Sequence, residues 1–342
     1  DMIAEEDMVI TVSRGGYVKR SPLSLYRAQR RGGKGRTGMA TKEEDIVEHL
    51  FIASTHSYML VFTDKGRVYW VKVHMLPSVG PNARGKAIVN LLELEKNENV
   101  RALLTVRDFD EAEYIVMVTE KGRVKKTALS AYSNVRTSGI IAIRLNDDDD
   151  LHGVRLTDGE SQIFIGTYEG KAIRFDEKDV RPMGRTAAGV RGINLKGDDH
   201  VVAMTVLSEE TEAKILSVTE RGYGKQTSVG EYRLQGRGGS GVINVRTTAK
   251  NGKVAGIVSV EPGDEILLIS ENGKIIRPQA DEIRSTGRAS QGVKVLHVDE
   301  DDRLVACVKI VERDEEDLDE TELNEDANAI LDATSSDDET VH

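Results

Sequence analysis

The residues best suited to binding chemistry form one short segment rich in arginine, lysine and glycine. It contains Gln29, Arg30, Arg31, Gly32, Gly33, Lys34 and Gly35, and Arg36 follows it. Of the thirteen residues from Arg27 to Met39, five are basic, four are glycine and none is acidic. Glycine lets a backbone approach a polyanion closely, while guanidinium and ammonium groups neutralise phosphate charge. The segment therefore predicts a site for nucleic-acid phosphates; the alternative is a solvated surface loop.

Basic side chains also recur at two positions of a longer repeat. One set stands one to four residues before a glycine: Arg84, Arg136, Arg185, Arg237 and Arg288. The other set stands three or four residues after an earlier glycine: Lys19 and Arg20, Lys125 and Lys126, Arg174, Lys225, and Arg277. Equivalent positions in a radial repeat fold share one height and radius, so both sets are predicted to form one exposed cationic rim. Tyr69 and Trp70 take the second position in one repeat and interrupt this rim.

The repeat that must position these residues occurs six times. Each copy has a short apolar run, a serine or threonine, two further residues and a glycine, which is typical of a hairpin turn. These anchor glycines are spaced by 50, 56, 48, 52 and 51 residues: Gly16, Gly66, Gly122, Gly170, Gly222 and Gly273. A second glycine follows the anchor by 17 residues in the third repeat and by 19 in the others: Gly35, Gly85, Gly139, Gly189, Gly241 and Gly292. The residue ten positions after each anchor is predicted to lie in the core: Tyr26, Leu76, Tyr132, Val180, Tyr232 and Ile283.

About four strands in each of six repeats predict an all-β, propeller-like fold with six blades. The blades are expected over residues 1–310, in repeats of about 8–57, 58–113, 114–161, 162–212, 213–264 and 265–310. One such unit cannot bury both faces of its sheet, so neighbouring blades must pack on each other. Radial packing also protects sheet edges that would otherwise pair with other chains.

The charge of the chain is divided very unevenly. The net charge is −11, but residues 311–342 hold 14 acidic side chains and one basic, which leaves 44 acidic and 46 basic side chains in the first 310 residues. The acidic segment has few large apolar groups and is predicted to be a disordered tail. It serves either as a solubilising appendage or as a DNA mimic that competes for the cationic rim.

Several functional classes lack support in the sequence. A phosphate-binding Gly-x-x-x-x-Gly-Lys-Ser/Thr motif is missing, and so are paired His or Cys residues at zinc spacing. The run Asp147–Asp150 is interpreted as a solvated turn rather than a metal site. The single cysteine, Cys307, excludes an internal disulfide, and no apolar run reaches the length needed to span a bilayer. We therefore predict a non-catalytic, intracellular binding module that needs no cofactor of its own.

The nucleic acid predicted for this rim is duplex DNA. Single-strand binders stack bases on aromatic side chains, and only 15 residues here are Phe, Trp or Tyr. A circular track of cations would curve a duplex held by its phosphates, at a bending cost of about 1–6 kcal/mol for 20–30 base pairs. A propeller that acts as a protein-interaction platform is the alternative from another functional class.

The segment Gln29–Gly35 resembles, at all seven positions, the signature box of the C-terminal domain family of the bacterial DNA gyrase A subunit. The six repeats and the acidic tail are also similar to that family, whose fold is a β-pinwheel with strands exchanged between blades. The corresponding domain of topoisomerase IV is a second possibility, but the intact box and the sixth repeat favour gyrase.

This resemblance implies that the chain wraps duplex DNA with positive handedness. The box would hold the exiting end of the wrap. An A2B2 enzyme, formed with the remainder of the A subunit and with the B subunit, would then introduce negative supercoils with ATP. ATP and Mg²⁺ would act in domains outside this chain, which resembles a fragment of the A subunit. The resemblance further implies a cytoplasmic, nucleoid-associated bacterial protein and a monomeric isolated domain.

Overall fold

The computed structural model describes residues 3–23, 47–79, 83–109 and 113–309. Its strands form six small sheets, one for each blade, which confirms the predicted all-β, six-bladed fold. The strands of each sheet are given from its inner to its outer edge. The first blade has β3 (Val47–Ser54), β1 (Asp7–Ser13), β2 (Tyr17–Pro22) and β6 (Lys86–Ala87), and the second has β7 (Val100–Val106), β4 (Tyr58–Thr63), β5 (Arg67–Lys72) and β10 (Ile140–Ile141). The third has β11 (Leu151–Thr157), β8 (Tyr114–Thr119), β9 (Arg123–Ala128) and β14 (Val190–Arg191). The fourth blade has β15 (Val201–Leu207), β12 (Gln162–Thr167), β13 (Lys171–Asp176) and β18 (Val242–Ile243), and the fifth has β19 (Val254–Val260), β16 (Lys214–Thr219), β17 (Tyr223–Ser228) and β22 (Val293–Lys294). The sixth has β23 (Leu304–Lys309), β20 (Ile266–Ser270) and β21 (Ile275–Ile276).

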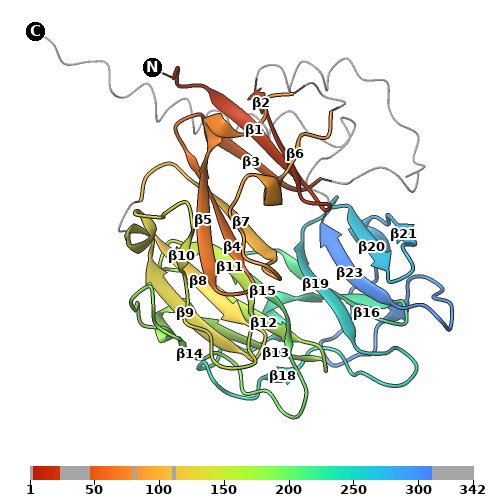
Figure 1. Cartoon of the computed structure of the whole chain (residues 1–342). Coiled ribbons are helices and arrows are strands. Elements are labelled where there is room, and N and C mark those ends of the chain that lie inside the picture. Colours follow the sequence, from red (N-terminus) through yellow and green to blue (C-terminus); the bar gives the residue numbers. More distant parts are fainter. Residues whose placement is uncertain (1–2, 24–46, 80–82, 110–112, 310–342) are drawn as a thin grey trace, which may run out of the picture.

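Short 3₁₀ turns connect the strands. They are η1 (Val73–Met75), η2 (Ile88–Asn90), η3 (Leu129–Tyr132), η4 (Glu177–Asp179), η5 (Val229–Glu231) and η6 (Ala280–Glu282). The innermost strands of successive blades contact each other in the order β3, β7, β11, β15, β19 and β23. Figure 1 shows most of these inner strands near the middle of the molecule, with the other strands of each sheet outside them.

The anchor motif forms the hairpin turn that its glycine predicts. Gly122 has φ of 90° and donates its N–H to the carbonyl of Thr119, with a distance of 3.0 Å. The Thr119 hydroxyl accepts the next backbone N–H, that of Arg123, at 3.1 Å. This second bond explains why serine or threonine stands three residues before the glycine, because a short hydroxyl side chain satisfies a turn N–H.

The outermost short strand of each four-stranded sheet comes from the next repeat. β6 belongs to the second repeat and pairs with β2 of the first, and β10 of the third repeat pairs with β5 of the second. The same exchange joins β14 to β9, β18 to β13 and β22 to β17. These pairings confirm the pinwheel exchange that the resemblance implied, and in the second to sixth repeats they place the residues after the second glycine at the outer edge of the preceding blade.

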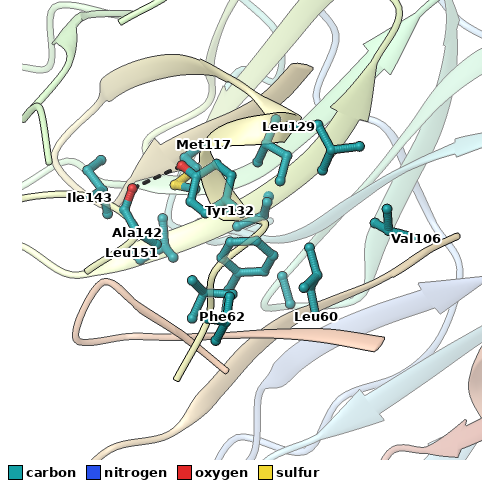
Figure 2. Close-up of a cluster of buried hydrophobic side chains, with 14 residues drawn as sticks. Leu60, Phe62, Val106, Met117, Leu129, Tyr132, Ala142, Ile143 and Leu151 are labelled. Carbon is teal, nitrogen blue, oxygen red and sulfur yellow. Dashed lines mark hydrogen bonds between the residues drawn. The ribbon is translucent and has the colours of Figure 1, made fainter. Parts of the chain in front are cut away.

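The hydrophobic core is divided among the interfaces between neighbouring blades. Leu60 and Phe62 of β4 face Ile115 and Met117 of β8, whereas Met59 of the same strand faces the first blade. Alternate residues of a strand point to opposite faces, so β4 and β8 are apolar on both sides. Figure 2 shows one of these clusters. At the predicted core position of each repeat, Leu76, Tyr132, Val180, Tyr232 and Ile283 are buried; Tyr26 lies outside the described residues.

Candidate nucleic-acid interface

The glycine-rich box and the acidic tail lie outside the described residues. This applies to Gln29, Arg30, Arg31, Gly32, Gly33, Lys34, Gly35 and Arg36, and to residues 311–342. The interface is therefore built from the equivalent loops of the other repeats, which the structure describes.

In the second to sixth repeats, the second glycine crosses the preceding blade at very close range. Gly189 has φ of 85°, and a Cβ atom placed on it would lie 2.5 Å from the carbonyl oxygen of Val124 in β9. Any other residue there would be strained by its backbone conformation and would overlap a neighbouring backbone. This glycine therefore brings the loop onto the neighbouring sheet, and the donated strand β14 begins at the next residue.

The arginines before the second glycine lie on this outer edge. Arg185, Arg237 and Arg288 each donate a guanidinium hydrogen bond to the last carbonyl of a donated strand, on Ile141, Arg191 and Ile243 respectively. A guanidinium has five N–H donors, so such a bond orients the group and leaves donors for a ligand. Arg237 is exposed, and Arg185 and Arg288 are partly exposed.

The other two arginines of this set are exposed as well. The Arg84 guanidinium carbon lies 5.3 Å from the centre of the Tyr17 ring, an arrangement that favours a cation–π contact. Arg136 is exposed at the end of the third repeat's loop, before Gly139. All five arginines of this set are therefore accessible to solvent from equivalent loops.

The second predicted set of cations is not an exposed ring, and this prediction is wrong for three lysines. Lys125, Lys126 and Lys225 are at most 4% exposed. They lie on the third strand of a blade, and neighbouring blades cover both faces of that strand. The sequence pattern showed that the positions recur, but a recurring position is as compatible with the interior as with the surface.

The remaining members of the second set mostly hold the next blade in place. Arg20 donates from Nε to the Leu76 carbonyl at 2.7 Å, and Arg174 donates from Nη1 to the Val229 carbonyl at 2.9 Å. Lys126 makes the same kind of contact with the Glu177 carbonyl at 3.0 Å, and its Nζ lies 3.7 Å from the Glu177 carboxylate. Arg277 is exposed and forms an ion pair with Glu265 at 2.6 Å. These side chains act chiefly in the packing of the blades.

Further exposed cations, which were not predicted from the sequence, lie on and after the donated strands. Lys86 lies on β6, Arg191 on β14 and Lys294 on β22, and all three are exposed at outer sheet edges. Arg144 and Arg246 are also exposed, and each stands five residues after its second glycine. Basic residues recur one or two positions and five positions after the second glycine, and this recurrence is the sequence signal that could have revealed both groups.

The run Asp147–Asp150 forms a turn, as interpreted from the sequence. Asp149 is buried, and its Oδ1 accepts the backbone N–H groups of Lys121 and Asp150 at 3.0 and 2.9 Å. Across the part of the chain that the structure describes, no group of three or more His, Cys, Asp or Glu side chains is arranged to hold a metal ion.

A cavity of about 530 Å³ lies beside the inner strands. Its arginines are paired with carboxylates: Arg101 lies 3.8 Å from Glu120, and Arg303 lies 3.1 Å from Glu220. Burial lowers the pKa of His152, which also lines the cavity, to about 4, so this imidazole is neutral at pH 7. The cavity therefore offers no uncompensated positive charge to a polyanion, unlike the outer edge.

The family model described as "DNA gyrase C-terminal domain, beta-propeller" matches six segments of the chain: residues 7–54, 57–107, 113–158, 161–208, 213–261 and 264–310. The DNA gyrase A subunit of Salmonella typhimurium (strain LT2) is 46% identical over 320 residues, which are 93% of this chain and 36% of that protein. The corresponding protein of Clostridium acetobutylicum is 45% identical over 322 residues, 94% of this chain and 39% of that protein. The chain thus spans little more than a third of these relatives.

Two solved structures share the fold. The C-terminal domain of a DNA topoisomerase IV superimposes with a TM-score of 0.81 and 31% identity, covering 98% of this chain and all of that one. A DNA gyrase A C-terminal domain gives a TM-score of 0.66 and 26% identity, covering 90% of this chain and all of that one. Among the described residues, no helix is long and apolar enough to cross a membrane. The six matched repeats and the identity to gyrase subunits together show that the chain belongs to the DNA gyrase C-terminal domain family.

Proposed function

We propose that this chain binds duplex DNA through its phosphates along the outer edge of the blades and wraps it chirally. The observation that carries the proposal is the recurrence of exposed cations at the edge created by strand exchange. In successive repeats these are Arg84 and Lys86, Arg136 and Arg144, Arg185 and Arg191, Arg237 and Arg246, and Arg288 and Lys294. Phosphate contacts of this kind position a duplex without selecting its sequence.

The aromatic residues support a duplex rather than a single strand as the ligand. Tyr132 and Tyr232 are buried in the core. Trp70 is half-buried and packs edge-on against Tyr58, with ring centres 4.8 Å apart. A stacking platform for unpaired bases needs several exposed rings, and these residues do not supply one.

The resemblance of Gln29–Gly35 to the gyrase box extends the proposal to the whole enzyme. The box would hold the exiting DNA end, and ATP-driven passage of DNA in an A2B2 assembly would then introduce negative supercoils. ATP and Mg²⁺ would act in domains outside this chain, in the cytoplasm and near the nucleoid of a bacterium. The alternatives are the corresponding role in topoisomerase IV, whose C-terminal domain has a similar fold, and a protein-interaction platform.

Linking-number measurement with the isolated chain tests the wrapping proposal. Nicked circular plasmid is incubated with the protein at low salt, ligated and then freed of protein. We expect a positive shift in linking number, because right-handed wrapping is captured when the circle is closed. An unchanged linking number would favour the interaction platform.

The salt dependence of DNA affinity tests the proposed surface. The triple variant Lys86→Ala, Arg191→Ala, Lys294→Ala should weaken binding and reduce the slope of log K against log[salt] by about three, roughly one for each lost phosphate contact. The control variant Lys65→Ala, Lys121→Ala, Lys196→Ala removes three exposed cations from the loops and turns between strands instead. Equal effects of the two variants would contradict a specific outer-edge track.

The box is tested in the assembled enzyme. Arg30→Ala, Arg31→Ala, Lys34→Ala should abolish negative supercoiling and leave ATP-independent relaxation intact, since relaxation does not need a wrapped segment. Retained supercoiling would remove the box from the mechanism.

A further inference from the structure

Three lysines occupy one position in alternate repeats, three residues after the anchor glycine. In the first, third and fifth repeats this residue is lysine and the residue seven positions later is tyrosine: Lys19 with Tyr26, Lys125 with Tyr132, and Lys225 with Tyr232. In the second, fourth and sixth repeats the pairs are Tyr69 with Leu76, Ile173 with Val180, and Ile276 with Ile283. The lysine and the tyrosine at the later position therefore occur together, every second blade.

The ammonium groups of these lysines donate hydrogen bonds to backbone carbonyls. Lys125 Nζ donates to the carbonyls of Ala142 and Arg185, and Lys225 Nζ donates to those of Asn244, Arg288 and, at 3.3 Å, Gly287. Lys19 Nζ donates to the Ala83 carbonyl at 3.1 Å. In all three cases one acceptor lies in the loop that precedes the second glycine of the next repeat.

Tyr132 and Tyr232 contact residues that also accept hydrogen bonds from Lys125 and Lys225. The Tyr132 hydroxyl donates to the Ala142 carbonyl at 3.1 Å, so it shares an acceptor with Lys125, as Figure 2 shows for the tyrosine. The Tyr232 hydroxyl bonds the side-chain oxygen of Asn244, whose carbonyl accepts from Lys225. Lys125 and Lys225 thus each join their own repeat to the outer loop of the next, and Tyr132 and Tyr232 bind residues of their own repeat that also accept from these lysines.

We propose that Lys125 and Lys225, with Lys19 in the equivalent place, are positioning residues that hold the arginine-bearing outer loops of the second, fourth and sixth repeats for DNA. This inference rests on the proposed function. Lys125 holds the carbonyl of Arg185 itself, and Lys225 that of Arg288. The guanidinium groups of these two arginines are in turn tied to Ile141 and Ile243, so backbone and side chain are both oriented.

The alternate blades show that the fold does not require these lysines. Ile173 fills the same position in the fourth blade and is fully buried. A buried ammonium that has only carbonyl partners is costly to desolvate, and an apolar side chain of similar size is often neutral or stabilising in its place. A purely structural role would therefore be served by an aliphatic residue, whereas loop positioning uses the hydrogen-bond donors.

The charge of these amines provides a readout that a packing role would not change. Burial, with the nearby Arg185, lowers the pKa of Lys125 to about 7. The pKa of Lys225 is lowered to about 8. Burial is the main cause; Glu231 opposes it, and Arg288 acts in the same direction as burial. Lys225 has three carbonyl acceptors, two of them in the outer loop of the sixth repeat, and a neutral amine has only two N–H donors, so deprotonation must weaken this set of contacts.

The experiment compares Lys125→Met, Lys225→Met with the wild-type chain and with Lys121→Met, which removes an exposed lysine from the third blade's turn. Far-UV circular dichroism and thermal unfolding first establish that each variant folds. Affinity for a linear duplex is then measured from pH 6 to 9. We expect wild type and Lys121→Met to lose affinity as the pH rises through 7 to 8, and the double variant to bind roughly five-fold more weakly at pH 6 with a flat profile.

Calorimetry of wild-type DNA binding in buffers of different ionisation enthalpy gives a second measurement that needs no variant. If DNA favours the loops held by charged lysines, binding at pH 8 must take up protons, by thermodynamic reciprocity. Absence of proton uptake, or a folded double variant with wild-type affinity and pH profile, would overturn the inference while DNA binding itself stood. A wild-type chain that binds no duplex at all would overturn both this inference and the proposed function.

Discussion

At the scale of single residues, adjacent lysines on one strand have different partners because successive side chains point to opposite faces. Lys126 faces the carboxylate of Glu177, a compensating charge within the next repeat. Lys125 faces carbonyl groups and a neighbouring arginine. Both are buried, so position along the strand decides which lysine is neutralised by an ion pair and which by dipoles.

The second glycines allow a residue-scale prediction about stability. Gly189→Ala should destabilise the chain by at least about 1–2 kcal/mol, the cost of a left-handed non-glycine residue, with a further cost from overlap with the Val124 carbonyl. Gly184→Ala, in the same loop, is the control, because no atom lies within 4 Å of the added methyl group. Denaturant unfolding checks this. Equal midpoints for the two variants would show that the close crossing is not required.

At the scale of elements, η4 joins the third and fourth blades through the carboxylate of Glu177. Its Oε2 accepts from the Thr157 hydroxyl at 2.7 Å, its Oε1 accepts the Ser161 N–H at 2.7 Å, and Lys126 supplies the opposite charge. The carboxylate is fully buried. One side chain thus links β9, the end of β11 and the turn before β12.

Glu177→Gln tests this link between blades. Loss of the negative charge leaves the Lys126 ammonium buried without its counter-ion, so we expect a loss of about 3–5 kcal/mol of unfolding free energy. The control is Glu160→Gln, the same chemical change in the exposed pair of Glu160 with Lys178. That variant should unfold almost as wild type does. A small effect of Glu177→Gln would mean that the surrounding hydrogen bonds suffice without the charge.

At the scale of the whole molecule, strand exchange joins the six blades into one structure while it creates the outer edge. Each donated strand lies on the sheet of the preceding repeat, so most sheets contain residues of two repeats. The core is likewise shared between neighbouring blades. Stability and the proposed DNA track therefore depend on the same inter-blade contacts.

The pH dependence of global stability follows from these buried groups. Lysine in an unfolded chain titrates near pH 10.4, whereas Lys125 and Lys225 have folded pKa values of about 7 and 8. Between about pH 7 and 8.5 the unfolded state therefore binds more protons than the folded state. The free energy of unfolding should rise with pH over this range, by up to about 1.4 kcal/mol per pH unit for each proton of difference. His152 gives the same sign between about pH 4 and 6.5.

Chemical denaturation across this range checks the prediction. Lys125→Met, Lys225→Met should remove the rise above pH 7 and leave the rise below it. Stability and DNA affinity are thus expected to change in opposite directions as the pH increases from 7 to 8.5. A parallel decline in both would contradict the assigned role of the two lysines.

The repeat number, the hairpin turns and the buried position ten residues after each anchor could be predicted from the sequence. All three follow from local patterns: a glycine that needs positive φ, a hydroxyl that satisfies a turn, and a spacing that recurs. The arginines before the second glycine were also found at accessible positions. In the second to sixth repeats these loops each carry an arginine before the second glycine, and solvent reaches that arginine in all five.

Only the tertiary structure decided which recurring cations face solvent. Lys125 and Arg185 both sit at regular positions of the pattern, yet one is enclosed by the next repeat and the other lies at the edge. Lys86, Arg191 and Lys294 became candidates because their strands cross to another blade. Burial depends on which distant segment packs over a residue, and strand exchange supplies that segment from the following repeat, beyond the reach of any local periodicity.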